Sequence, residues 1–225
     1  MRYRRFHPFF MQLGRMLLLM QRESSRRGAP VLSVEQAIGR GPFAILIFTV
    51  LSARTRDETT IRAGKRLLSR APTPQKLSRL TAAQIARLIY PVGFYKTKAK
   101  HLRALAHRLI SEFGGNVPPD FKPLVSLPGV GRKTANIVLA SAFGKNTIGV
   151  DTHVHRISNR LGLVKTRSPE KTGDALDRLI PEKYKSALNL SMVAFGQTVC
   201  TPRRPKCSEC PLRKDCPKRG VVSPR

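Results

Sequence analysis

The sequence predicts a fold built almost entirely of helices. Its most apolar stretch, FAILIFTVLSA at residues 43–53, is too short to cross a bilayer and has no one-sided helical stripe, so we expect a buried central helix. Periodicity alone leaves a buried strand open, but Pro42 at the first helical position favours the helix. Residues 96–113 carry leucines at helical spacing, and only residues 147–150 resemble a strand.

The first thirty residues are rich in arginine and contain no acid before Glu23. Such a start is typical of targeting peptides. However, Arg15 interrupts the apolar run, and no clear small-residue cleavage site follows. We therefore favour a retained helix that packs on the body of the protein over a cleaved segment.

Capping signals place the other helices. Ser33 with Gln36 predicts a short helix that Gly39-Arg40-Gly41 ends, and Thr81 with Gln84 begins another. The segment 54–70 is expected to turn and then enter a helix. Further helices are predicted over residues 96–113, 120–127, from about 132 to 143, 168–180 and 184–199.

The net charge is the most unusual bulk property. The chain has 42 Lys and Arg against 13 Asp and Glu, a formal charge of +29 and an isoelectric point near 11.4. This is the profile of a polyanion-binding protein. Charge alone does not separate DNA from RNA or an anionic membrane, although no segment reaches the ~20 apolar residues of a membrane span.

The segment LPGVG, residues 127–131, predicts a hairpin between two helices, because Pro128 lacks an N–H donor and glycines favour a tight turn. The amides of Gly129, Val130 and Gly131, with a helix that opens near Arg132, are expected to form a pocket for a phosphate oxygen.

Lys133 follows in the first turn of that helix and becomes a nucleophile if burial lowers its pKa. Asp151 is the candidate proton-handling partner. A simple tight turn and a solvated lysine are the alternative interpretation of these residues.

Four cysteines cluster near the carboxyl end with the spacing C-x6-C-x2-C-x5-C. A basic chain without a clear secretory signal argues against disulfides. Cysteine chemistry by itself leaves structural zinc and an iron-sulfur cluster open. The ligands in either case are Cys200, Cys207, Cys210 and Cys216.

The strings LPGVGRKTAN and VDTHVHRISNR, together with the cysteine spacing, closely resemble the endonuclease III family of helix-hairpin-helix DNA glycosylases. The resemblance implies a 4Fe-4S cluster on the four cysteines, Lys133 as nucleophile and Asp151 as its helper. It implies two domains, residues 35–145 with six helices, and residues 1–34 with 146–225 carrying the cluster, with Lys133 and Asp151 at the cleft between them.

The implied activity is that of a bifunctional DNA glycosylase and AP lyase, which removes oxidised pyrimidines of the thymine glycol type and cleaves abasic sites by β-elimination through a lysine Schiff base. A mismatch glycosylase acting on G·T or G·U pairs is the alternative enzyme. A non-catalytic iron-sulfur DNA-binding protein is the alternative of another class. Family members that are monofunctional adenine or mismatch glycosylases lack a lysine at this position, so Lys133 argues against the first alternative. Lys133 together with Asp151 argues against the second.

Two loops are candidates for wedges that fill the space left by an extruded base. Arg54 stands where the family has a glutamine after Leu-Ser-Ala, and it serves either as a wedge or as a phosphate contact. Phe94 lies in the second loop, VGFY, and is expected to be core rather than wedge. Between the first two cysteines, Arg203, Arg204 and Lys206 form a basic loop that is expected to dock on DNA.

The remaining expectations concern the setting of the protein. The five histidines form no ligand pattern, and His153 is expected to satisfy local polar groups. The sequence has no heptad pattern that would indicate a helical interface with a second subunit, so we expect a monomer. The partner is double-stranded DNA with damaged bases or abasic sites, without a membrane, in the cytoplasm of a prokaryote and at its chromosome.

Overall fold

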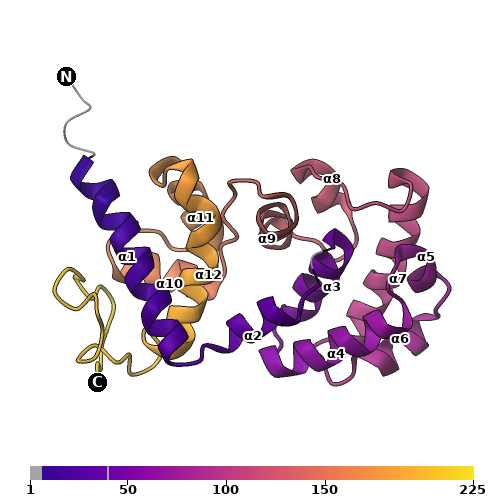
Figure 1. Cartoon of the computed structure of the whole chain (residues 1–225), viewed down its shortest axis with the longest axis horizontal. Coiled ribbons are helices and arrows are strands. Elements are labelled where there is room, and N and C mark those ends of the chain that lie inside the picture. The colour runs from indigo at the N-terminus through magenta and orange to yellow at the C-terminus, as the bar shows by residue number, and fades with distance from the viewer. Residues whose placement is uncertain (1–6, 40) are drawn as a thin grey trace. The chain divides into compact units, whose positions relative to one another are not determined.

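A computed structural model describes residues 7–39 and 41–225; of the arginine-rich start, residues 1–6 lie outside it, as does Arg40. The described residues contain twelve helices (Figure 1). They are α1 (His7–Arg26), α2 (Pro30–Ala37), α3 (Pro42–Ser52), α4 (Asp57–Arg70), α5 (Pro74–Ser78), α6 (Ala82–Ile89), α7 (Tyr95–Phe113), α8 (Phe121–Ser126), α9 (Arg132–Phe143), α10 (Thr152–Arg160), α11 (Pro169–Leu179) and α12 (Glu182–Thr198). The all-α prediction is confirmed.

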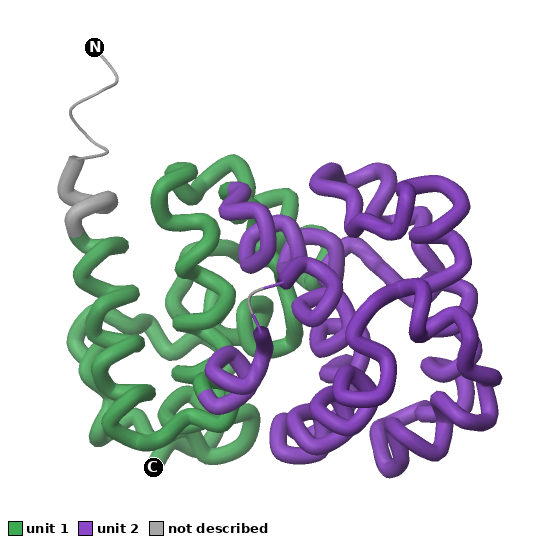
Figure 2. Tube along the Cα trace, turned by 45° about the vertical axis from the view of Figure 1, so that its right-hand side comes forward, with its two compact units in different colours: residues 1–32, 146–225 green, residues 33–145 purple. Residues whose placement is uncertain are grey.

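The chain divides into two compact units (Figure 2). One is continuous and spans residues 33–145. The other combines residues 1–32 with residues 146–225. The second unit is therefore assembled from the two ends of the chain.

The continuous unit is built around α3. Every residue from Ile45 to Leu51 is buried, and the helix packs against α4, α9 and α7. Phe48 lies so close to α4 that a Cβ added at Gly64 would stand 2.6 Å from its ring. The predicted buried central helix is confirmed, and its apolar character all round follows from having neighbours on several sides.

The discontinuous unit is built around α12, which packs against α1 and α10. Leu13, Leu17 and Met20 of α1 are buried in its core. The amide of Gln21 donates to the hydroxyl of Ser191 on α12 at 3.0 Å. The described part of the amino-terminal segment is therefore a helix packed on the body of its unit.

Several predicted helix ends are confirmed by their caps. Thr81 and Gln84 form a capping box at the start of α6, and Ser168 caps α11 by accepting from the amide of Lys171. Gly114 and Gly144 end α7 and α9 in the left-handed conformation. These ends were readable because each depends on a local hydrogen bond or a positive φ.

Two expectations were wrong. Helix α2 begins at Pro30 rather than Ser33, because proline takes the first helical position and needs no donor there. Residues 147–150 form no strand in the described chain. Ile148 and Val150 are buried, and the carbonyl of Gly149 accepts a hydrogen bond from the Asn189 side chain instead of from a neighbouring strand.

Across residues 7–39 and 41–225, no helix is both long and apolar enough to traverse a bilayer.

Candidate active site and iron-sulfur loop

The predicted hairpin joins α8 to α9 within the continuous unit. Its turn is closed by the amide of Val130, which donates to the carbonyl of Leu127 at 3.1 Å. Gly129 has φ of +79°, and a Cβ at this position would lie 3.1 Å from atoms of His101. Both the backbone conformation and the space therefore require glycine here.

Helix α9 begins directly after the turn. Gly131 takes the N-cap position in an extended conformation, and within the described chain no side chain caps the helix. Gly131 and Arg132 are exposed, so the start of α9 is accessible to solvent. Val130 differs from its neighbours, because its side chain is buried and its amide is used in the turn.

Lys133 lies in the first turn of α9 and is half-buried. The next residues along the helix, Thr134, Ala135 and Asn136, are buried and anchor the turn in the core. The lysine thus stands beside the exposed start of α9, on a helix anchored in the core.

Asp151 belongs to the discontinuous unit, whereas Lys133 belongs to the continuous one. Asp151 is the N-cap of α10, and its Oδ1 accepts from the amides of His153 at 2.9 Å and Val154 at 2.8 Å. The carboxylate is therefore fixed in orientation by the helix that it starts.

Arg54 and Phe94 form a pair on the surface of the continuous unit. The guanidinium of Arg54 lies over the Phe94 ring, 5.5 Å from its centroid. Both residues have positive φ, +52° and +56°, and Phe94 is 62% exposed. The expectation that Phe94 belongs to the core was wrong, because the left-handed N-cap of α7 directs this residue to solvent.

The four cysteines line one cavity in the discontinuous unit, together with apolar residues that include Ile157, Phe195 and Leu212. All four thiols are free of disulfides. Burial raises the pKa of the Cys210 thiol to about 11, and burial raises that of Cys216 as well. Partly buried thiols that converge on one cavity fit a bound metal centre, whose positive charge stabilises their thiolate forms.

Two arginines of α10, which sequence analysis did not single out, reach the cysteine loop. Arg160 is only 8% exposed; its guanidinium donates to the carbonyls of Thr201 at 2.7 Å and Pro202 at 2.8 Å, and lies 3.4 Å from the sulfur of Cys200. Arg156 donates to the carbonyl of Cys200 at 2.8 Å. Their spacing of one helical turn was the signal available in the sequence.

The basic loop between Cys200 and Cys207 keeps its arginine side chains in solvent. Arg203 and Arg204 are exposed and Lys206 is partly exposed. The hydroxyl of Thr201 donates to the carbonyl of Arg203 at 2.9 Å. The loop therefore has an internal hydrogen bond and presents cations to an anionic partner.

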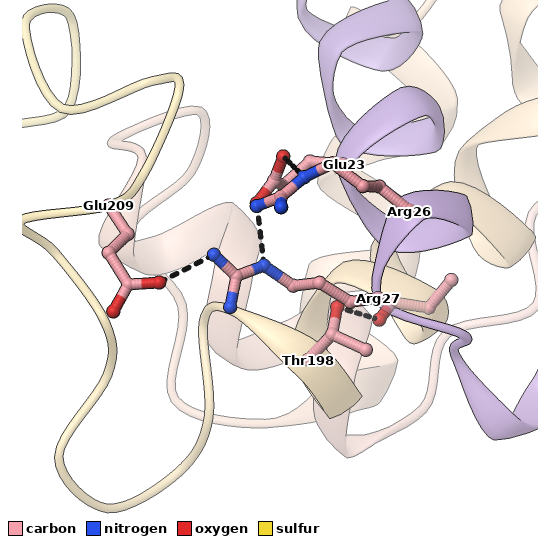
Figure 3. Close-up of polar contacts among 6 residues, drawn as sticks. Glu23, Arg26, Arg27, Thr198 and Glu209 are labelled. Carbon is pink, nitrogen blue, oxygen red and sulfur yellow. Dashed lines mark hydrogen bonds and ion pairs between the residues drawn. The ribbon is translucent and has the colours of Figure 1, made fainter.

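The end of α1 contacts the same cysteine-rich segment (Figure 3). Arg27 lies between two carboxylates and donates to Glu23 and to Glu209, each at 2.6 Å. Glu209 stands between Cys207 and Cys210 in the sequence. Hydrogen bonds from Arg26 and Arg27 hold the pKa of Glu23 at about 2, so this carboxylate is charged near neutral pH.

The four cysteines that line the cavity fit a four-iron cluster, which takes its thiolates at separate irons. The four sulfurs would hold such a group, and Arg160 would lie beside it.

Two family models match the chain. Residues 47–182 match the HhH-GPD superfamily of base excision DNA repair proteins. Residues 200–216 match the iron-sulfur binding domain of endonuclease III. The second match begins and ends on Cys200 and Cys216, so it contains all four cysteines and assigns them to an iron-sulfur site.

Known proteins agree with these models. Endonuclease III of Thermotoga maritima is 50% identical over 175 residues, which cover 78% of this chain and 82% of that protein. A trapped covalent endonuclease III–DNA intermediate, with an estranged adenine, has a TM-score of 0.81 at 34% identity, covering 92% of this chain and 95% of the other. A non-covalent endonuclease III–DNA complex gives 0.77 at 37% identity, with coverages of 80% and 85%. The chain belongs to the endonuclease III family of iron-sulfur DNA glycosylases and AP lyases.

Proposed function

We propose that this DNA glycosylase and AP lyase excises oxidised pyrimidines of the thymine glycol type, with Lys133 as its nucleophile. The observation that carries the proposal is the place of Lys133, half-buried in the first turn of α9 next to a glycine hairpin and a helix end without a side-chain cap. A DNA phosphate bound at that helix end brings the adjoining sugar to the lysine.

In the proposed reaction, the neutral amine of Lys133 attacks C1′ of the deoxyribose as the glycosidic bond breaks and the base leaves with a proton. The amine then loses a proton, the sugar ring opens, and C1′ becomes a protonated Schiff base. Loss of a proton from C2′ expels the 3′ phosphate and breaks the strand. The free enzyme returns when water hydrolyses the Schiff base.

Asp151 supplies the carboxylate of this reaction. Its Oδ1 already accepts two amide hydrogen bonds, so the group is held in place before substrate binds. A fixed negative charge stabilises the cationic sugar that forms when the base leaves, and it helps to move protons. We assign it these two roles.

DNA contacts come from several surfaces. We propose that Gly129, Gly131 and Arg132 bind phosphate, that Val130 supports their turn, and that Arg203, Arg204 and Lys206 hold the backbone through the cysteine loop. The iron-sulfur cluster supplies the fixed ends of that loop. The formal charge of +29 supports an extended electrostatic contact, whose affinity falls steeply with salt.

We propose a monomer that acts on damaged or abasic double-stranded DNA at a prokaryotic chromosome in the cytoplasm. The bacterial relative at 50% identity supports the setting. We propose that residues 35–145 and the rest of the chain are the two domains, in keeping with the compact units.

The test is borohydride trapping on duplexes that carry thymine glycol or an abasic site. Wild-type protein is expected to form a covalent adduct with both, and Lys133→Gln with neither. Lys122→Gln is the control, because Lys122 is an exposed lysine on the neighbouring helix α8. An adduct in Lys133→Gln would contradict the assigned nucleophile. An adduct of wild type with the abasic site alone would contradict the assigned lesion.

A further inference from the structure

Lys98 on α7 is a buried lysine that the proposed reaction does not use. It is 8% exposed. Its Nζ donates to the carbonyl of Leu51 at 2.7 Å, to that of Ala53 at 2.5 Å and to the hydroxyl of Thr55 at 3.2 Å. All three ammonium hydrogens thus have acceptors at one place, the end of α3.

A buried ammonium is costly, so a lysine in this position requires compensation. Burial lowers the pKa of Lys98 to about 8. The acceptors belong to the last turn of α3 and to the residues after it, where helical carbonyls lack partners and the helix dipole is negative. Lys98 therefore takes the place of a C-terminal cap for α3.

The same contact joins two loops. The hydroxyl of Thr55, which accepts from Lys98, also accepts from the amide of Gly93 at 3.1 Å. The loops are pressed together here, because a Cβ on Gly93 would lie 2.4 Å from the carbonyl oxygen of Arg54. Lys98 is thus bonded directly to the loop after α3 and, through Thr55, to the loop before α7.

Each loop carries one of the paired surface residues at its tip. Arg54 and Phe94 adopt left-handed backbone conformations that cost a non-glycine residue about 1 kcal/mol or more. Such conformations persist where surrounding bonds determine them. Backbone hydrogen bonds of Thr55 to Ser52 and of Tyr95 to Val92 hold each loop separately, and the side chains of Lys98 and Thr55 add bonds that join the two loops.

We propose that Lys98 is a positioning residue that holds Arg54 and Phe94 together as one rigid wedge, which enters the duplex when the damaged nucleotide leaves the stack. This rests on the proposed function. The two tips must enter the duplex at the same step, so their separation and orientation have to be set before DNA binds. Free loops would lose entropy at that step, and the fixed pair loses less.

The proposed role of Lys98 predicts different effects on two substrates of the same enzyme. A thymine glycol must be extruded before it is cut, so its excision depends on the wedge. An abasic site has no base to extrude, so its cleavage depends less on the wedge. A variant that loosens the wedge is therefore expected to lose base excision in preference to strand cleavage.

The experiment compares Lys98→Met with wild type in single-turnover assays on both duplexes. Lys98→Met keeps a long side chain but removes the three hydrogen bonds that the ammonium donates to Leu51, Ala53 and Thr55. Excision is expected to fall about tenfold or more, with abasic cleavage reduced less than about threefold. Borohydride trapping on the abasic duplex gives the active fraction for both proteins. The control is Lys100→Met, an exposed lysine on the same helix.

A second readout follows the wedge itself. A 2-aminopurine placed opposite the lesion brightens when it is unstacked, and this rise is expected to shrink in Lys98→Met. Thr55→Val removes the hydroxyl that bridges the two loops, and it is expected to cause the same selective loss of excision and the same smaller fluorescence rise. If Lys98→Met does not fold, Thr55→Val provides the test of the proposed wedge. Equal losses on both substrates, or an unchanged fluorescence rise in a folded variant, would overturn the inference. Failure of wild-type protein to trap either duplex would contradict the proposed function instead.

Discussion

The guanidinium of Arg54 lies 5.5 Å from the centroid of the Phe94 ring, and the two residues come from separate loops of the continuous unit. A cation–π contact at such an exposed site contributes only about 0.5–1 kcal/mol to stability. The pair is therefore better explained by what it presents to solvent than by what it adds to the fold.

Alanine at either position is expected to reduce base excision about tenfold or more while leaving stability nearly unchanged, because surface changes usually shift the free energy of unfolding by less than about 0.5 kcal/mol. The double variant is expected to lose little beyond the single ones, since the two side chains act together. Single-turnover excision and thermal melting measure both effects. Additive losses in the double variant would show that the two residues act separately.

Arg54→Gln restores the residue that the family places after Leu-Ser-Ala. Arginine has only donors to offer an orphaned base, whereas glutamine both donates and accepts. We expect the variant to change the relative excision rates with adenine and guanine opposite the lesion. Rates measured against all four opposite bases provide the check, with Arg56→Gln as the control in the same exposed loop. An identical ranking in wild type and Arg54→Gln would remove Arg54 from opposite-base recognition.

Asp151 combines a structural and a chemical role, and two substitutions separate them. Asparagine is a good N-cap, so Asp151→Asn is expected to retain stability to within about 0.5 kcal/mol but to lose most excision activity. Asp151→Ala is expected to lose the activity and about 1 kcal/mol of stability as well. Denaturant melts and excision rates distinguish the two. Normal activity in a folded Asp151→Asn would exclude the carboxylate from the chemistry.

The hairpin offers a matched pair of glycines. Gly129→Ala is expected to destabilise the protein by about 1 kcal/mol or more, since it places a side chain at positive φ and close to His101. Gly131 has an ordinary φ of −95° and nothing within 4 Å of an added Cβ, so Gly131→Ala should fold normally. A loss of DNA affinity in Gly131→Ala would then report on phosphate access alone, as measured by fluorescence anisotropy at several salt concentrations.

Arg160→Met is expected to accelerate iron loss, because the carbonyls of Thr201 and Pro202 lose their donor and the sulfur of Cys200 loses its nearby cation. The measurement is the decay of the visible absorbance of the cluster in the presence of a chelator. Lys214→Met is the control, as an exposed cation of the same segment that does not line the cysteine cavity. Equal decay rates would show that Arg160 does not protect the site.

Burial of Lys98 is also expected to make the free energy of unfolding depend on pH. Its pKa is lowered from 10.5 to about 8 in the folded protein, so between these values the unfolded chain binds more protons. Stability contributed by this residue therefore rises with pH from about 8 to 10.5, by no more than about 3 kcal/mol, and is constant below that window. The difference in melting temperature between wild type and Lys98→Met is expected to change across the window. A pH-independent difference would contradict the lowered pKa.

Local chemistry explains which features the sequence predicted. The capping box at Thr81, the glycine stops at Gly114 and Gly144, and the buried run after Pro42 each depend on neighbours in the chain. The cysteine spacing likewise predicted its ligand set, since ligand spacing is a property of the sequence.

Contacts between residues far apart in the chain explain the features that the sequence did not predict. The burial of Arg160 depends on carbonyls about forty positions later, and that of Lys98 on acceptors about as far before it. Phe94 is a large apolar residue, which favours a buried position, yet the left-handed backbone at this residue directs its side chain to solvent. The roles of Lys133 and Asp151 remain predictions, because they depend on bound DNA.

The contact of Arg27 with Glu209 has a consequence for biosynthesis. Helix α1 is made before its partners, because the apolar residues that its buried face packs against and the Glu209 carboxylate lie after position 146. The continuous unit, 33–145, has all its core residues in one stretch and can fold during translation. Helix α1 therefore gains its packing partners only after the cysteine segment has been made, so its docking and the assembly of the metal site are expected to occur together.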